Sequence, residues 1–324
     1  MRLSHRLAVP ALLAASAVGL AACGDGSAAG SEGAAAEGGL TVVTATNVYG
    51  DIASVVGGDD VEVTPIVDSL SQDPHSYEAT VQDKLSVSEA DLVIENGGGY
   101  DPFLRRLAEE TGVGTVLSAV ELSGLQEADA SEEAEDPAGG HADEEGHAHG
   151  SFNEHVWYDL PAMMTLADAI AGELGRLDEA NAEGYQERAD AFTAELQALQ
   201  DRLGALASGG QGGDVAVTEP VPVYLLEAAG LHNATPEEFT EAIEEESEVP
   251  VAVLEEMKVL VSGGTLDFLA YNGQTEGSQT EAVRSAAEEA DLPVLDFTET
   301  LPEGEDYVSW MAANTDSIEA ALGS

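Results

Sequence analysis

Short apolar runs alternate with amphipathic stretches from residue 40 onward. The β-branched runs at 41–46 and 61–67 and the apolar run at 91–94 predict strands, because each is short and bounded by polar residues. Apolar positions three or four residues apart predict the intervening helices. The remaining elements expected in this half are helices at 49–56, 81–90 and 102–110 and a strand at 113–117. Strands that alternate with helices form a parallel sheet covered by helices, so this half is expected to be an α/β lobe.

The same alternation returns after a long helical segment. Apolar residues spaced three or four apart predict one unbroken helix over 178–206, of about 43 Å at 1.5 Å per residue. Before it lies a helix at 161–174; after it come strands at 215–218, 266–271 and 294–297 and helices at 223–229, 236–246, 251–260, 281–290 and 309–322. The expected fold is therefore α/β, with two parallel-sheet βα lobes joined by one long rigid helix. The expected boundaries are 40–176, 177–208 and 209–324.

The amino-terminal segment is predicted to be a targeting signal and not part of the folded lobes. Arg2 and Arg6 precede an apolar run that ends near residue 22, which is typical of a secretory signal peptide over 1–22. Residues 20–23 look like a bacterial lipoprotein box, which implies a lipid on Cys23 and a flexible linker over 23–39. No later stretch approaches the roughly 20 apolar residues of a membrane span. We therefore expect a chain anchored by lipid on the extracytoplasmic face of the cell membrane.

The balance of charged residues limits the kinds of partner that the chain can bind. The chain has 324 residues, with 10 Lys and Arg against 63 Asp and Glu, for a formal net charge of −53. Binding to phosphates needs clustered cations, so this balance excludes a nucleic-acid partner. A surface this acidic keeps a protein soluble, most effectively where salt screens the self-repulsion. We therefore hypothesise that the protein works in a salty environment.

The seven histidines are the most informative candidates for chemistry. Three of them, His141, His147 and His149, lie in an acidic stretch over 127–150 that has no apolar periodicity and is expected to be a mobile loop. His75 directly follows a predicted strand, where α/β proteins place their ligands. His155 follows the acidic loop, and His232 is interpreted as a helix-end or surface residue.

Two histidine segments carry a family resemblance. Residues 73–78, Asp-Pro-His-Ser-Tyr-Glu, and 154–159, Glu-His-Val-Trp-Tyr-Asp, look like the two histidine motifs of the metal-specific ABC-transporter solute-binding lipoproteins. Those proteins bind zinc or manganese. The resemblance extends from residue 41 to 322 and includes the segment Asn-Gly-Gly-Gly-Tyr-Asp over 96–101. It implies that His75 and His155 are the first two ligands of a single metal ion.

The resemblance also implies two ligands from the second lobe. The third follows the first strand of that lobe, where this chain has Glu219 rather than the histidine common in zinc-binding members. The fourth is a carboxylate after the last strand. Glu299 matches best by its distance from Tyr307, and Asp296 is the alternative that the sequence leaves open. Asn272 and Gln274 are expected to lie near the site as donors to these ligands.

These four proposed ligands are chemically suited to one divalent metal ion. Two neutral imidazoles and two carboxylates balance a doubly charged ion, and mixed nitrogen and oxygen ligands suit manganese, zinc or iron. In zinc-binding members of the family, an acidic His-rich loop between the first two ligands is proposed to gather metal. The loop with His141, His147 and His149 therefore favours zinc, with manganese next.

The predicted function is a monomeric, non-enzymatic receptor that captures one Zn²⁺ or Mn²⁺ and delivers it to an ABC transporter permease. A metal-dependent hydrolase is one alternative, because two histidines and carboxylates can hold a catalytic zinc. The sequence has no H-E-x-x-H pattern for a general base, which argues against it. A surface adhesin or interaction lipoprotein is the other alternative, since lipid-anchored members of this family have been named so.

Overall fold

A computed structural model describes residues 39–128, 152–210, 212–245 and 247–323. The predicted signal peptide, almost all of the linker with Cys23, and His141, His147 and His149 lie outside these residues. The stretch expected as a loop from Glu127 needs one correction. Glu127 and Ala128 lie in a helical stretch that begins at Leu125.

The first lobe is built on a four-stranded parallel sheet of order β2-β1-β3-β4. Its strands are β1 (Leu40–Thr46), β2 (Val61–Val67), β3 (Leu92–Glu95) and β4 (Val116–Ser118). β1 reads as a nearly continuous buried run because helices cover both faces of a parallel sheet. The helices of this lobe are α1 (Asn47–Gly57), α2 (Val81–Glu89), α3 (Pro102–Thr111), α4 (Ala119–Ser123) and α6 (Leu160–Leu177), with 3₁₀ turns η1 (Gly58–Asp60) and η2 (Val156–Tyr158).

The second lobe repeats this topology. Its sheet has the order β6-β5-β7-β8, again all parallel. The strands are β5 (Asp214–Val217), β6 (His232–Asn233), β7 (Leu266–Asn272) and β8 (Val294–Phe297). The helices are α8 (Val223–Ala228), α9 (Glu237–Glu244), α10 (Val251–Ser262), α11 (Ser278–Glu289) and α12 (Tyr307–Ala321). The predicted fold of two α/β lobes is confirmed, although α4 and β6 were not predicted. His232 lies in β6 and is exposed, as expected for a surface residue.

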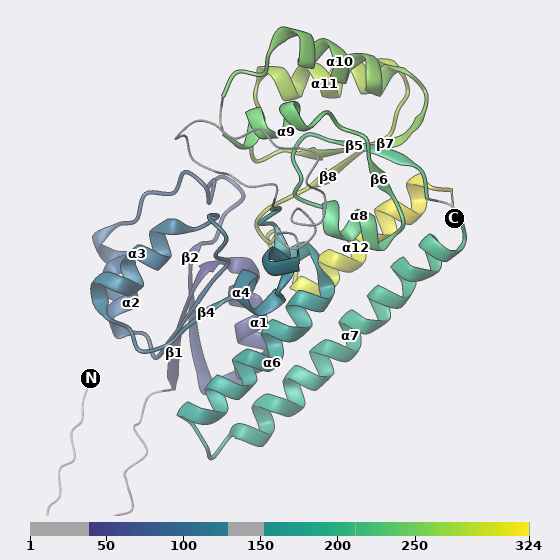
Figure 1. Cartoon of the computed structure of the whole chain (residues 1–324). Coiled ribbons are helices and arrows are strands. Elements are labelled where there is room, and N and C mark those ends of the chain that lie inside the picture. The colour runs from purple at the N-terminus through teal and green to yellow at the C-terminus, as the bar shows by residue number, and fades with distance from the viewer. Residues whose placement is uncertain (1–38, 129–151, 211, 246, 324) are drawn as a thin grey trace, which may run out of the picture. The chain divides into compact units, whose positions relative to one another are not determined.

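The long helix α7 (Ala182–Ser208, 27 residues) packs on helices of both lobes. It contacts α1 and α6 of the first lobe and α8 and α12 of the second, along its whole length in Figure 1. It begins four residues later than predicted. The Asp178 side chain accepts hydrogen bonds from Ala180 N at 3.2 Å and Asn181 Nδ2 at 2.7 Å, and these bonds form the turn that separates α6 from α7.

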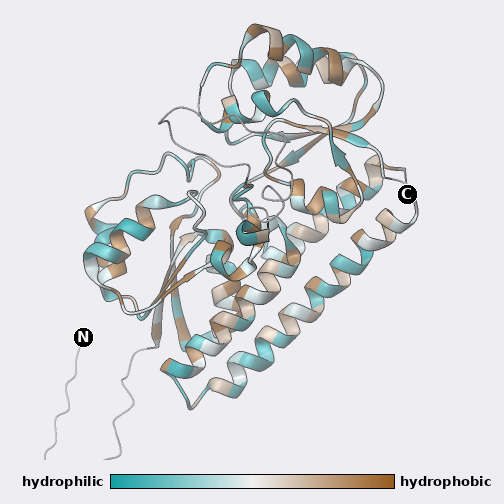
Figure 2. Cartoon of the chain, in the orientation of Figure 1, coloured by the Kyte–Doolittle hydropathy of each residue, from teal (hydrophilic) through white to brown (hydrophobic). Residues whose placement is uncertain are grey.

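One hydrophobic core crosses from lobe to lobe. It includes Val48 of α1, Phe192 of α7, Val217 of β5 and Trp310 of α12, and two smaller clusters lie elsewhere in the lobes. In Figure 2 the strands of the first lobe are mostly hydrophobic, while the helices carry both hydrophobic and hydrophilic positions. The lobes are therefore fastened to each other through α7 and α12. Within the described ranges, no helix combines the length and apolar character that crossing a bilayer requires.

Candidate metal centre

His75 lies in the loop that follows β2. The Asp73 carboxylate accepts hydrogen bonds from His75 N at 2.9 Å and from Ser76 Oγ at 2.7 Å, so this short polar turn fixes the backbone that carries the imidazole. The His75 side chain is 24% exposed, which leaves it at the border between the buried site and solvent. Its ring packs edge-on against Tyr100, with centroids 4.6 Å apart.

His155 immediately precedes η2 and is fully buried. Asn153 Oδ1 accepts from His155 N at 3.1 Å and lies 2.7 Å from His155 Nδ1. An amide oxygen only accepts, so Nδ1 carries the proton and Nε2 is left for a ligand. Burial lowers the pKa of His155 well below its ordinary value, with a smaller contribution from His75. A neutral imidazole is the form that binds a metal.

Glu299 lies just after β8 and is 1% exposed. Its Oε2 accepts from the Tyr100 hydroxyl at 3.0 Å, and its Oε1 accepts from Asn272 Nδ2 at 2.7 Å. Gln274 Oε1 accepts from the backbone N–H of Glu299 at 2.7 Å. The carboxylate is therefore oriented at both oxygens, and its backbone is held as well.

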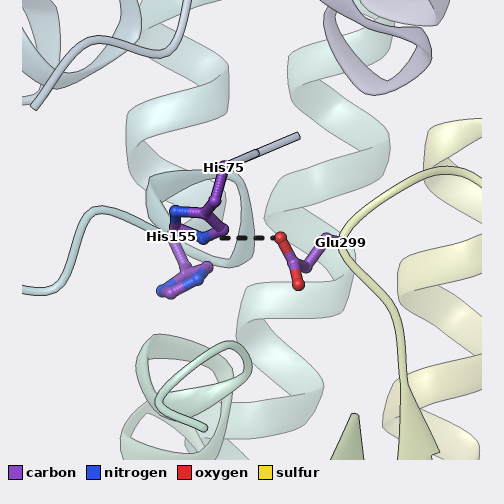
Figure 3. Close-up of side chains that lie close together, drawn as sticks. All are labelled: His75, His155 and Glu299. Atoms are coloured by element: carbon purple, nitrogen blue, oxygen red, sulfur yellow. Dashed lines mark ion pairs between the residues drawn. The ribbon is translucent and has the colours of Figure 1, made fainter. Parts of the chain in front are cut away.

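These three side chains converge on one point. One ligand atom from each of His75, His155 and Glu299 lies within 4.8 Å of the others. Figure 3 shows His75 and Glu299 facing each other, and His75 Nε2 lies 3.6 Å from Glu299 Oε2. The two histidines come from the first lobe and the carboxylate from the second. The structure therefore assembles a nitrogen and oxygen donor set at the junction of the lobes.

Glu219 lies beside this group rather than in it. It follows β5, is 5% exposed, and accepts from Thr275 Oγ1 at 2.6 Å. Asn272 Nδ2 donates to Glu219 as well as to Glu299, so one amide bridges the two carboxylates. Asn272 is thus the donor that was expected. Gln274 instead accepts from the Glu299 backbone, and its Nε2 donates to the Gln72 carbonyl of the first lobe at 3.3 Å.

Asp296, the alternative to Glu299, points elsewhere. Its side chain is 60% exposed and lies 3.5 Å from Arg284 Nη1. Burial distinguishes the two acids, because Glu299 is enclosed among ligand-type residues while Asp296 belongs to a surface ion pair.

Two buried carboxylates close together resist ionisation. Burial raises the pKa values of Glu219 and Glu299, and the negative charge of Glu299 raises that of Glu219 further. A divalent cation placed between them offsets this repulsion directly. The arrangement is therefore suited to hold a cation rather than a neutral ligand.

Two cavities include both His75 and Glu244. One, of about 370 Å³, is lined by Glu219, Glu244 and Gln274 among others; the second, of about 270 Å³, is lined by Glu154 and several glutamates of α9. Burial, together with the nearby charges of Glu154 and Glu219, raises the pKa of Glu244 to about 8. Both cavities include His75 and Glu244, so the candidate site borders solvent-accessible space lined by carboxylates.

Sequence reasoning assigned no role to Tyr100, Asn153, Glu154 or Glu244. Tyr100 lies in the glycine-rich segment after β3, where Gly97, Gly98 and Gly99 all have positive φ. A glycine run at the carboxyl end of a parallel strand indicates a backbone that turns sharply beside a ligand, and this signal could have pointed to Tyr100. Glu244 lies far along the chain in a helix rich in acids, and nothing in the pattern distinguishes it.

Comparison with known proteins identifies the family. Residues 42–321 match the family model described as zinc-uptake complex component A, periplasmic, or ZnuA. The chain belongs to this family. It is 25% identical over 335 residues to the metal ABC transporter substrate-binding lipoprotein FimA of Streptococcus parasanguinis, covering 97% of each chain. It is also 30% identical over 163 residues to the manganese-binding lipoprotein MntA of Halalkalibacterium halodurans, covering 50% of this chain and 48% of that relative.

The fold of this family member also matches solved structures. The periplasmic zinc-binding protein TroA of Treponema pallidum superposes with a TM-score of 0.69 at 18% identity, covering 88% of this chain and 99% of that one. At this identity the likeness concerns the fold alone. Some of the similar proteins are named for zinc and others for manganese. Family membership therefore identifies a metal-binding transport protein but not the ion that it binds.

Proposed function

We propose that the chain captures one divalent transition-metal ion between its lobes and delivers it to an ABC transporter permease. The observation that carries this proposal is the convergence of His75, His155 and Glu299 within 4.8 Å at the lobe junction. Glu219 is proposed as the fourth ligand. A small reorientation of its buried carboxylate toward the group would complete a set of two nitrogens and two oxygens.

For the ion, we propose that zinc binds more tightly than manganese. The order of affinity for a given nitrogen and oxygen site places zinc above manganese. The carboxylates can each bind through one or two oxygens, so the same set accommodates four-coordinate zinc or a more highly coordinated manganese. The delivered ion then depends on supply as well as on affinity.

For the mechanism, we propose that capture uses small lobe tilts and side-chain ordering. The hydrophobic core that includes Phe192 and Trp310 crosses between the lobes, which favours limited movement over wide hinge closure. Cys23, outside the described residues, is proposed as the lipid anchor that holds the receptor on the extracytoplasmic face of the membrane. The His-rich loop over 127–150 is proposed to gather metal.

The test is a competition titration of the mature chain, purified without a His tag, with Zn²⁺ and Mn²⁺. We expect one tightly bound ion per chain, lost in His75→Ala and in Glu299→Ala. Stoichiometric binding that survives both substitutions would refute the site. Growth of a deletion strain under zinc and under manganese starvation then names the delivered ion, and no defect under either would refute transport.

A further inference from the structure

The imidazole of His75 has a carboxylate at each of its two nitrogens. Nε2 lies 3.6 Å from Glu299 Oε2, inside the donor group, and Nδ1 lies 3.8 Å from Glu154 Oε1 on the other side of the ring. Only one ring nitrogen can bind the ion, since the other must keep its proton in a neutral imidazole. What faces Nδ1 therefore decides how well Nε2 serves as a ligand.

Glu154 is held in place by its surroundings. Asn96 Nδ2 donates to the Glu154 backbone carbonyl at 3.0 Å. A Cβ built on Gly98 would lie 3.5 Å from Glu154 Cβ, so the glycine-rich turn packs closely against the start of this side chain. The Glu154 side chain is only 20% exposed, although it lines the 270 Å³ cavity. A fixed backbone and a mostly buried side chain restrict the positions that its carboxylate can reach.

The two histidines of the site differ in this outer partner. His155 Nδ1 faces the amide oxygen of Asn153 at 2.7 Å, which is a neutral acceptor. His75 Nδ1 faces the carboxyl group of Glu154 at 3.8 Å, which is an acidic side chain. A carboxylate acceptor strengthens the imidazole as a ligand more than a neutral acceptor does, because it stabilises the positive charge that metal binding places on the ring.

We propose that Glu154 is a positioning residue that holds the Nδ1 proton of His75, presents Nε2 to the ion and thereby sets the affinity of the site. This inference rests on the proposed function. The separation of 3.8 Å is longer than a hydrogen bond, and a small rotation of either side chain brings the pair into bonding distance when Nε2 binds a cation. Glu154 acts through His75, not as a ligand.

The experiment titrates the mature, untagged chain with Zn²⁺ against a chelator of known affinity. Glu154→Gln keeps the shape and an acceptor oxygen but removes the charge, and Glu154→Leu removes both. We expect zinc affinity to fall about 10-fold in the first and up to about 100-fold in the second, the range typical for partners of metal-bound histidine. Glu237→Gln is the matched control, since Glu237 lines the same cavity from α9. It is expected to change affinity by no more than about 3-fold, as a charge removed at a distance would.

A second measurement separates positioning from general structure. Nitrogen NMR of the zinc-loaded chain, with ¹⁵N-labelled histidine, reports which His75 nitrogen carries the proton and how strong its hydrogen bond is. We expect a strongly bonded Nδ1–H in the parent that weakens in Glu154→Gln and weakens further in Glu154→Leu.

The outcomes are distinguishable. Parent affinity in both Glu154 variants, or an equal loss in Glu237→Gln, overturns the inference while leaving the proposed function intact provided that His75→Ala has lost binding. If the parent chain itself binds neither zinc nor manganese, the proposed function fails and the inference fails with it.

Discussion

The hydroxyl of Tyr100 donates a hydrogen bond to Glu299 Oε2 at 3.0 Å, and this contact joins the two lobes inside the site. The Tyr100 ring also lies against both histidines, with centroids 4.6 Å from His75 and 5.9 Å from His155. Tyr100 is fully buried, so its hydroxyl has few alternative partners. One side chain therefore aligns donor groups from both lobes before any ion arrives.

Removing this hydroxyl tests the alignment. Tyr100→Phe keeps the ring packing and loses one hydrogen bond to a charged group, a contact worth about 1.5–3 kcal/mol. We expect metal affinity to fall about 10-fold in a competition titration. Tyr185→Phe is the control, because it removes a hydroxyl bonded to Asp178 at 3.2 Å at the start of α7, away from the donor group. Equal losses in the two variants would show that Tyr100 has no particular role at the site.

Substitution of Glu219 is expected to raise the stability of the metal-free chain and to lower its affinity for metal. Glu219→Gln removes one of two buried carboxylates that repel each other, so the metal-free chain is expected to melt higher, by about 2–4 °C per kcal/mol gained. The same change removes a proposed ligand, and metal affinity is expected to fall about 100-fold. Glu255→Gln on α10 is the control, where the acid is 62% exposed and paired with Lys258 at 2.9 Å. A variant that is both less stable and unable to bind would point to simple misfolding.

The raised pKa values of Glu219 and Glu299 predict how pH acts on the metal-free chain. Because burial raises both pKa values above the ordinary 4.5, the folded chain holds protons that the unfolded chain has released in the interval above 4.5. The contribution of these groups to stability is therefore complete at low pH and is lost as pH rises through the folded pKa values. We expect the contribution to appear as a melting-temperature difference between parent and Glu219→Gln that widens with pH.

Metal affinity should change with pH in the direction opposite to stability. The ion must displace protons from both carboxylates, so affinity is expected to rise as pH increases through the same interval and then level off. Calorimetry in buffers of different ionisation enthalpy would count the protons released on binding. A release of no protons near neutral pH would contradict the raised pKa values.

A direct comparison of two variants tests whether Asp296 or Glu299 is the metal ligand. Asp296 is 60% exposed beside Arg284, so Asp296→Ala is expected to bind metal as the parent does. Glu299→Ala removes a group that is 1% exposed and belongs to the donor cluster, and is expected to abolish binding. Titration of both variants decides the matter, and the reverse result would exchange their roles.

The sequence predicted most of the fold because its cues are local. The alternation of β-branched runs with helical periodicity predicted every strand that the structure describes except β6, which has only two residues. The start of α7 was predicted too early because Asp178 ends the preceding periodicity through side-chain hydrogen bonds, which hydrophobic spacing does not register. The four proposed ligands came from a family resemblance, and the geometry now shows how three of them meet.

The outer contacts of the site could not be predicted in the same way. Tyr100 and Glu299 are 199 positions apart, and Asn272 bridges two acids that follow different strands. The Tyr100 contact depends on how the two sheets face each other, and the Asn272 contacts depend on the order of β5, β7 and β8 within one sheet. No local pattern encodes either. Glu154 was visible only as part of a histidine motif, because its relation to His75 depends on the path of a loop.

Arg188 provides a final prediction about stability, apart from the site. From α7 its guanidinium donates to the carbonyls of Val56 at 2.7 Å and Gly57 at 2.8 Å, the last residues of α1. These bonds satisfy carbonyls that a helix end leaves without partners, and the positive charge suits the negative end of the helix dipole. We expect Arg188→Ala to destabilise the chain by about 1–2 kcal/mol, measured by denaturant unfolding.

Arg176→Ala is the matched control for this charge. Arg176 is 60% exposed and pairs with Glu173 three residues earlier in the same helix, a contact worth about 0.3–0.5 kcal/mol. Because neither arginine touches the donor group, metal affinity should stay at the parent value in both. If Arg188→Ala unfolds at the same denaturant concentration as Arg176→Ala, the contact between α7 and the end of α1 adds nothing to stability, and the apolar core alone must fasten that helix to the first lobe.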